Sequence, residues 1–308
     1  MRICLPRMNG GKGNFYLRLE RFLRKIGVSV TNNIKDRYDI ILLSRDFHLF
    51  NTLDKKKKIV LRLDGFAITG SSKYMPIIKK RASGIVYQTE FTKKIFDKYV
   101  NKFKTQKKTI IFNGADPLYY SSIKPLKANR NNVYITFGNW KPSQRLEDII
   151  ESFILADIDN SVLYVVGNTS KSGVNKKKYS NYDNIFFTGQ INHKKLVSYI
   201  KAAKASIHLR WCDWCPNGVV ESICCGTPVI TNNVSGTKEI IELCGGIVCN
   251  IDPPLTIMPK KTKAAPKIDR KVVASAIKEC TNININTKYV DIRKIAKKYK
   301  LFFEQIIG

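Results

Sequence analysis

The sequence is poor in acidic residues and contains no long hydrophobic run. It has 24 Asp and Glu against 54 Lys and Arg, which gives a formal net charge of +30 over 308 residues. No stretch of about 18 apolar residues occurs, so a membrane-spanning helix is not expected. The first eight residues, Met-Arg-Ile-Cys-Leu-Pro-Arg-Met, lack a long apolar segment, so a signal peptide is not expected. We therefore expect a cytoplasmic protein in which all eight cysteines are reduced thiols.

Several common catalytic motifs are also missing. The three histidines, His48, His193 and His208, do not cluster in sequence, and no Gly-x-Ser-x-Gly segment is present. A serine-hydrolase site is therefore not indicated, and we interpret the histidines as surface or core residues. The glycine loop Gly10-Gly11-Lys12-Gly13 has neither the Walker A spacing nor the dinucleotide-binding spacing.

The excess of positive charge admits several kinds of partner. Basic surfaces attract nucleic acid, anionic lipid head groups or anionic substrates. Here the basic residues are spread along the chain, as at 55–58, 176–178 and 260–271, without the aromatic interleaving of a nucleic-acid reader. A coding bias toward Lys and Asn explains the composition equally well. Nucleic acid is thus not an expected partner, whereas peripheral contact with an anionic membrane stays open.

Short apolar runs alternate with amphipathic segments along the chain. Strands are expected at 2–5, 28–31, 39–43, 58–63 and 84–88, and again at 132–137, 161–166, 184–189 and 205–209. Helices are expected between many of them, for example at 15–26, 89–99, 144–155 and 193–203. This α/β alternation predicts parallel sheets covered by helices on both faces. A polar segment at 121–132 divides the two series.

The sequence thus predicts two Rossmann-like parallel-sheet domains. We place the first at residues 1–128 and the second at 129–289, facing a central cleft into which the carboxyl ends of the strands point. The final segment, 290–308, has the pattern of a basic amphipathic helix.

Residues 211–229 form the most informative stretch of the chain. Asp213 and Glu221 are separated by seven residues, with the turn Pro216-Asn217-Gly218 between them. A helix is predicted after the turn and a strand from Pro228 onward. A helix start offers backbone N–H groups that suit a diphosphate, and the acid inside the helix suits ribose hydroxyls.

This block resembles the signature of the retaining, nucleotide-sugar-dependent glycosyltransferases of family four, also called glycosyl transferases group 1. The resemblance extends to Cys215-Pro216-Asn217 and to the segment 235–241. It implies a GT-B fold in which the C-terminal helix returns to the first domain. It also implies transfer of a sugar from a nucleoside-diphosphate-sugar co-substrate to a hydroxyl of a glycan, protein or lipid-linked acceptor. Neither a metal nor another cofactor is expected.

The resemblance also assigns roles to single residues of the second domain. Glu221 would bind the ribose hydroxyls of the donor, and Asp213 would contact hydroxyls of the donor sugar. Asn217, Gly218 and Val219 would lie beside the diphosphate at the helix start.

Two residues of the first domain are assigned in the same way. Gly11 would lie near the donor phosphates and the acceptor. Asp64, in the segment Arg62-Leu63-Asp64-Gly65, would orient the acceptor or the donor sugar. For Asp64 the alternative is a turn-forming Asp-Gly pair.

The segment 138–145 departs from the family pattern. Members usually carry two cations here that grip the donor diphosphate, but Asn139 and Gln144 occupy those places. Lys141, Arg145 and Arg210 are the candidate substitutes, because a metal-free site needs cations against the leaving group. If none of these three side chains reaches the donor diphosphate, the chain is a non-catalytic relative that binds a glycan or a nucleotide sugar and has a decayed phosphate clamp. A polyanion-binding protein is the third hypothesis.

Four cysteines offer a different interpretation of the same block. Cys212 and Cys215 form a Cys-x-x-Cys pair, and Cys224 and Cys225 follow. Adjacent cysteines on a helix do not supply the second pair of a zinc site, and Pro216 interrupts the helix that a redox centre needs. We therefore predict no metal site.

Overall fold

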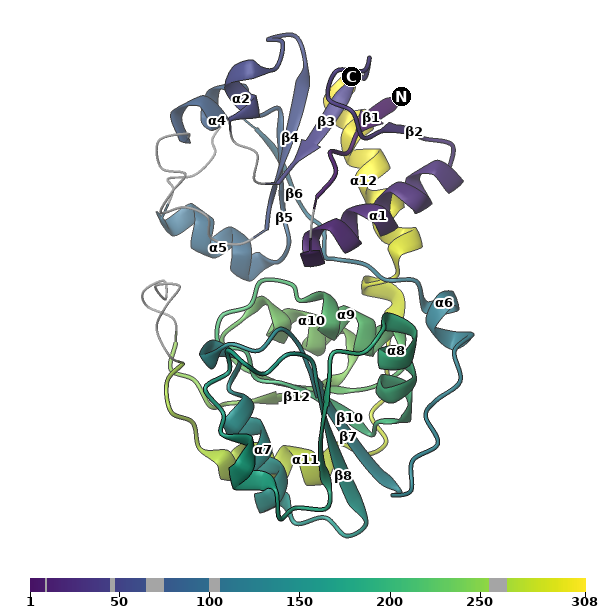
Figure 1. Ribbon diagram of the computed structural model, residues 1–308. Coiled ribbons are helices and arrows are strands. Elements are labelled where there is room, and N and C mark those ends of the chain that lie inside the picture. The colour runs from purple at the N-terminus through teal and green to yellow at the C-terminus, as the bar shows by residue number, and fades with distance from the viewer. Residues whose placement is uncertain (9, 45–47, 65–74, 100–105, 255–264) are drawn as a thin grey trace. The chain divides into compact units, whose positions relative to one another are not determined.

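The chain folds into two compact α/β units. The computed structural model describes all residues except 9, 45–47, 65–74, 100–105 and 255–264 (Figure 1). The first unit comprises Met1–Asp116 together with Val290–Gly308, and the second comprises Pro117–Tyr289. Each unit contains a six-stranded sheet whose pairings are all parallel. The predicted fold class of two Rossmann-like domains is confirmed.

The first sheet has the strand order β2-β1-β3-β4-β5-β6. Its strands are β1 (Arg2–Cys4), β2 (Ser29–Thr31), β3 (Ile40–Leu43), β4 (Lys58–Leu63), β5 (Gly84–Tyr87) and β6 (Lys107–Ile110). Every residue of β3 and β5 is buried, as expected for strands that are covered on both faces. The order reverses between β1 and β3, so the carboxyl ends of these strands flank the crevice of this sheet.

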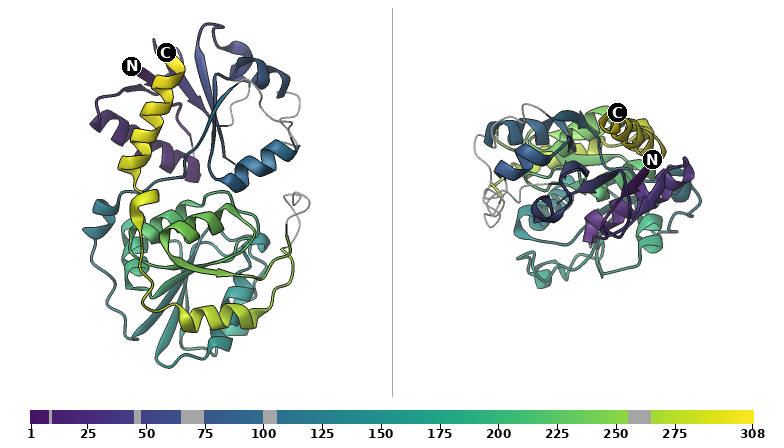
Figure 2. Two further views of the ribbon diagram at one scale, coloured as in Figure 1. Left: turned by 180° about the vertical axis from the view of Figure 1, so that it is seen from behind. Right: turned by 90° about the horizontal axis from the view of Figure 1, so that it is seen from above.

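Helices cover both faces of the first sheet. They are α1 (Gly10–Lys25), α2 (Leu49–Thr52), α4 (Met75–Arg81), α5 (Glu90–Tyr99) and α12 (Ile292–Ile307). Helices α1 and α12 lie side by side in Figure 1 and in the left view of Figure 2, and their apolar faces share one core with the sheet. Side chains of α2, α4 and α5 belong to the core on the other face. The predicted return of the C-terminal helix to the first domain is therefore confirmed.

The start of α1 differs from the sequence prediction. The segment Gly10–Gly13, predicted to be a loop, forms the first turn of the helix and includes Gly11. Glycine is needed at position 13 because a Cβ there would lie 2.1 Å from the carbonyl oxygen of Met8. Gly13 thus allows the helix start to pack closely against the preceding chain.

The second sheet has the strand order β12-β11-β10-β7-β8-β9. Its strands are β7 (Asn132–Phe137), β8 (Ser161–Val166), β9 (Ile185–Gly189), β10 (Ala205–His208), β11 (Val229–Asn232) and β12 (Gly246–Cys249). Its helices are α6 (Pro117–Ser121), α7 (Leu146–Ala156), α8 (His193–Ala202), α9 (Asn217–Cys224), α10 (Gly236–Cys244) and α11 (Arg270–Glu279). Short 3-10 turns occur at Pro142–Gln144, Lys176–Tyr179 and Thr287–Tyr289. In the described ranges no helix has the length and apolar character needed to span a bilayer.

The chain passes between the units at residue 116, twelve residues before the predicted boundary at 128. Residues 117–128 pack with the second unit because polar contacts hold them along α8. The ammonium of Lys201 donates hydrogen bonds to the carbonyl oxygens of Ser121 and Ile123, at 3.0 and 2.5 Å. The N–H of Leu126 donates to the carbonyl oxygen of Ser198 at 2.9 Å. The polar composition of this segment suggests a free linker, but its backbone carbonyl groups accept hydrogen bonds from the second unit.

Candidate active site

The second sheet gathers the predicted donor-binding residues at the carboxyl ends of its strands. Strand β7 begins this sheet in chain order, yet it pairs with both β8 and β10. The strand order therefore reverses between β7 and β10, where ligands bind in doubly wound sheets. The segment 138–145 follows β7, and the segment containing Asp213 follows β10.

Asp213 is a buried carboxylate that lies beside the side chains of Arg210 and His208. Its Oδ2 lies 3.3 Å from Nη1 of Arg210 and 3.5 Å from Nε2 of His208, and its Oδ1 accepts from the backbone N–H of Trp214 at 2.8 Å. Burial acts to raise the pKa of Asp213, but Arg210, His208 and the Trp214 N–H together lower it to about 2. The side chain therefore carries a full negative charge at neutral pH and can accept hydrogen bonds from hydroxyl groups.

Glu221 lies inside α9, one turn after the helix start at Asn217. Its side chain is buried, and its Oε2 lies 3.4 Å from Nε2 of His193 at the start of α8. The ring of Tyr119 stacks on the imidazole of His193, with 6.2 Å between ring centroids and 11° between planes. Residues from α6, α8 and α9 thus fix one carboxylate at the predicted ribose position.

Two of the three histidines therefore have a place that sequence spacing did not reveal. His193 is a surface residue with its side chain 42% exposed, and it also contacts Glu221, while His208 contacts Asp213. His208 is the last residue of β10 and His193 the first residue of α8, far apart in sequence. Only the parallel strand order brings both to the carboxyl edge of the sheet.

Glycines allow the backbone to pack closely at this edge. Gly167, after β8, has a φ of +111°, and a Cβ there would lie 2.0 Å from the carbonyl oxygen of Gly138. A Cβ on Gly218, in the first turn of α9, would lie 2.8 Å from the ring of Phe137. The start of α9 therefore packs directly against the end of β7, and Asn217 and Val219 begin the same helix.

The candidate cations differ in what they contact. Arg145 is buried and adopts a left-handed backbone conformation, and both Nη atoms bond the carboxylate of Asp252, one at 2.8 Å. Its Nη2 also donates to the carbonyl oxygen of Pro266 at 3.0 Å. In this structure the guanidinium of Arg145 is thus held by Asp252 and Pro266. Lys141 is exposed, and Arg210 is 43% exposed beside Asp213. These two remain the predicted phosphate ligands.

The first unit places Asp64 in a separate buried network at the end of β4. Its carboxylate accepts from the guanidinium of Arg62 and from the hydroxyl of Ser44. Arg62 also donates to the side-chain oxygen of Asn113, and to the hydroxyl of Tyr299 at 2.9 Å. Tyr299 belongs to α12, so the C-terminal helix completes this network. Asp64 is therefore more than a turn residue, and Gly65 beside it lies outside the described residues.

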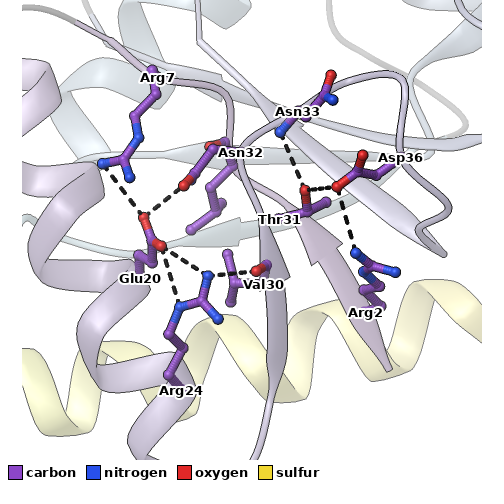
Figure 3. A network of polar contacts seen from close by, with 10 residues as sticks. Arg2, Arg7, Glu20, Arg24, Val30, Thr31, Asn32, Asn33 and Asp36 are labelled. Atoms are coloured by element: carbon purple, nitrogen blue, oxygen red, sulfur yellow. Dashed lines mark hydrogen bonds and ion pairs between the residues drawn. The ribbon is translucent and has the colours of Figure 1, made fainter.

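A second polar network of the first unit was not predicted. Glu20 of α1 accepts from the guanidinium of Arg24 at 3.0 Å and from the amide of Asn32 at 3.0 Å, and Arg7 lies 3.9 Å away (Figure 3). The amide of Asn32 also donates to the carbonyl oxygen of Leu5 at 2.8 Å. The network borders a small cavity of about 60 Å³ near the glycine start of α1. No sequence motif joins these residues.

The cysteine block forms no cluster of ligands in the part of the chain that the structure describes. Within those ranges no group of three or more His, Cys, Asp and Glu side chains is placed to hold a metal ion. All eight cysteines are free thiols. Burial raises the pKa values of Cys212 and Cys225 to about 12, so these thiols are protonated at neutral pH.

The two doubly wound units define a GT-B fold, and comparison with solved structures agrees. Sucrose-phosphate synthase from Thermosynechococcus elongatus superimposes with a TM-score of 0.72 at 15% identity, covering 99% of each chain. Anabaena HepE, in complex with UDP and glucose, gives a TM-score of 0.68 at 13% identity, covering 99% of this chain and all of that one. These superpositions show that the fold is shared, and at identities this low they show nothing beyond the fold.

Sequence comparison finds a known family over part of the chain. Residues 121–250 match the model described as glycosyl transferases group 1. The resemblance carried by residues 211–241 is thereby confirmed. An uncharacterized glycosyltransferase of Methanocaldococcus jannaschii is 26% identical over 246 residues, covering 75% of this chain and 61% of that protein. The chain thus spans about three fifths of the length of this relative.

Proposed function

We propose that the protein is a glycosyltransferase that moves a sugar from a nucleoside-diphosphate-sugar donor to an acceptor hydroxyl. The observation that carries the proposal is the pair of buried acids, Asp213 and Glu221, at the carboxyl edge of the second sheet. Each acid is held by a histidine, and Asp213 by Arg210 as well. Their order around the start of α9 is that of the family signature. The match of residues 121–250 to the glycosyl transferases group 1 supports it.

In this proposal each group has one task. Glu221, oriented by His193, accepts hydrogen bonds from the ribose hydroxyls of the donor. The first turn of α9, at Asn217, Gly218 and Val219, presents its backbone and its positive dipole end to the diphosphate. The ionised carboxylate of Asp213 accepts hydrogen bonds from hydroxyls of the donor sugar and so fixes the position of the ring.

Departure of the diphosphate requires positive charge near the leaving oxygen. Lys141 and Arg210 are the side chains that we assign to this task, because both are exposed whereas Arg145 is buried against Asp252. Electrostatic support of this kind commonly contributes several kcal/mol to a transition state. Asp64 of the first unit is assigned to the acceptor, with Arg62 and Ser44 holding its carboxylate. Retention of the anomeric configuration and independence of metal are carried over from the family resemblance.

The donor is tested first with UDP and UDP-glucose, because solved complexes of HepE contain them. Thermal shift and titration calorimetry are run with UDP, GDP, ADP and their sugars on the wild type, Glu221→Ala and Glu242→Ala. Glu242 is an exposed acid of α10 and serves as the matched control. One nucleotide should stabilise the wild type and the control, and Glu221→Ala should lose most of that stabilisation. If no nucleotide binds at concentrations far above ordinary donor levels, the donor assignment is wrong.

Chemistry is then tested by following release of the nucleoside diphosphate with candidate acceptors. Nuclear magnetic resonance of the product shows whether the anomeric configuration is retained, and an excess of EDTA shows whether a metal is required. Asp213→Asn should lower turnover by at least about a hundredfold, the scale on which a lost transition-state contact acts. Equal turnover by Asp213→Asn and wild type would remove Asp213 from the catalytic site.

A second candidate function is favoured by the state of Arg145. The chain has Asn139 where the family usually has a cation, and Arg145 is bonded to Asp252. A phosphate site that lacks these two cations fits a relative that binds nucleotide sugar without turning it over. Nucleotide binding that depends on Glu221, together with no turnover of any sugar nucleotide, would support this second candidate.

A further inference from the structure

The second unit has a partly open sheet face at β8 and β9. Residues of β8 and β9 point alternately to the two faces of the sheet. Ile185 and Phe187 pack into the core shared with α7 and α11, whereas Phe186 points to the opposite face and is 48% exposed. Parallel sheets are usually covered on both faces. The partly uncovered area at β8 and β9 therefore resembles a binding surface more than a core.

Two adjoining grooves follow the segment 122–130 along this face. One, of about 470 Å³, is bordered by residues 126–130, by β8 and β9, and by Tyr199 of α8. The other, of about 560 Å³, lies between residues 122–124 and the start of α8. The hydrogen bond from Leu126 to Ser198 lies where the two grooves meet, since Leu126 lines the first and Ser198 the second. Both grooves have the size of ordinary ligand sites.

Aromatic rings line the first groove. The rings of Tyr164 and Tyr199 meet edge to face with centroids 4.7 Å apart, and the ring of Phe186 lies 5.7 Å from that of Tyr164. Faces of aromatic rings carry partial negative charge and attract polarised C–H groups such as those on a pyranose ring. Asn129 and Asn160 also line this groove, and their amide groups are donors and acceptors of the kind that sugar hydroxyls use.

Positive charge lines both grooves. Their cationic lining residues are Lys124, Lys127, Arg130, Lys194 and Lys195. Among the described residues that border the grooves the one acid is Asp183, which pairs with Arg130 at 2.7 Å. The lining thus has a net positive charge beside a row of rings. A ligand that matches both features carries sugar rings and negative charge together.

We propose that this surface, formed by residues 122–130, β8, β9 and α8, is a binding site for an anionic glycan. Its sugar rings would stack on Phe186 and Tyr164, and its carboxylate, phosphate or sulfate groups would lie against the lysines. None of the lining residues belongs to the proposed donor site. The inference therefore stands or fails independently of the transferase proposal. Single-stranded nucleic acid also combines rings with charge, but the polar amides of Asn129 and Asn160 favour hydroxyl-rich sugars.

The test is titration calorimetry on the full chain at about 0.15 M salt, where long-range charge effects are screened. The probes are oligogalacturonate, a hyaluronan oligosaccharide, a neutral maltooligosaccharide and a short oligothymidylate. The variants are Phe186→Ala and the pair Lys124→Glu with Lys127→Glu. The controls are Tyr182→Ala, an exposed aromatic of the preceding loop, and the pair Lys171→Glu with Lys176→Glu. All of these variants change exposed side chains, and folding is checked by circular dichroism.

An acidic oligosaccharide should bind the wild type, and both groove variants should weaken it by about tenfold, as expected when a central contact is lost. The controls should bind like wild type, and so should Glu221→Ala, whose loss of nucleotide binding would report separately on the donor site. If charge reversal of the groove lysines and of the control lysines weakened glycan binding equally, the effect would be one of overall charge, and the proposal would be overturned. Failure of both acidic oligosaccharides to bind, or tighter binding of the oligothymidylate, would overturn it as well.

Discussion

Replacement of Asp213 by Asn should change how the stability of the second unit depends on pH. The pKa of Asp213 is about 2 in the folded protein, against an ordinary value of 3.8, because Arg210 and His208 outweigh the effect of burial. The difference of about 1.8 units corresponds to about 2 kcal/mol, at about 1.4 kcal/mol per unit. The ionised carboxylate therefore contributes about this much to the free energy of unfolding near neutral pH.

The sign of the pH effect follows from the direction of the shift. A carboxyl with a lowered folded pKa stabilises the native state fully above its unfolded pKa, near 3.8 here. That contribution is lost as the pH falls toward the folded pKa of about 2. The gap in stability between wild type and Asp213→Asn should thus be about 2 kcal/mol at pH values above about 5 and should narrow steadily below about 4.

The chain provides its own reporter for this measurement. All three tryptophans, at positions 140, 211 and 214, lie in the second unit, so intrinsic fluorescence follows the unfolding of that unit. Urea titrations across the acid range would give the free energy of unfolding for wild type, Asp213→Asn and the exposed control Asp159→Asn. A gap that stays constant with pH, or one equally large for Asp159→Asn, would refute the reasoning.

Three further predictions use the same unit. Arg145→Ala and Asp252→Ala should each destabilise it by about 3–5 kcal/mol in urea titrations, since each leaves a buried charge alone, and the double variant should lose less than the sum. Gly167→Ala should destabilise more than Gly173→Ala by about 1–3 kcal/mol, because both have positive φ but only at Gly167 would the Cβ meet backbone. His193→Phe should weaken nucleotide affinity several-fold with little change in kcat, whereas His193→Gln should keep the affinity of the wild type. An equal loss of affinity in both variants would contradict a hydrogen-bonding role for His193.

Local patterns in the sequence predicted most of the architecture. Alternation of apolar runs with amphipathic segments located the strands, because a strand buried on both faces must be apolar along its length. The helix after Pro216 and the strand after Pro228 appear where turn chemistry placed them. The return of the last helix came from the family resemblance, since an amphipathic pattern shows which face is buried but not against which domain.

Contacts between distant residues were beyond the sequence. Arg145 was a candidate phosphate ligand because it is close in sequence to the glycine end of β7. Its partner Asp252 lies 107 residues later, and no local pattern pairs them. His193 and His208 were set aside because they are separated in sequence, although the sheet brings each to a buried acid. The domain boundary was misplaced because polar residues in 117–128 bond through their backbone carbonyls, which composition does not show.

The position of α12 has a consequence for how the chain folds as it is synthesised. The core of the first unit includes Ile295, Tyr299 and Phe303, and the hydroxyl of Tyr299 accepts from buried Arg62. A ribosome adds Tyr299 to the chain 237 residues after Arg62. At ordinary rates of about 5–20 residues per second, the first unit waits at least about ten seconds with an incomplete core. The second unit, continuous in sequence, has every residue it needs before α12 is made. The unit that is translated first is thus the last that can finish folding.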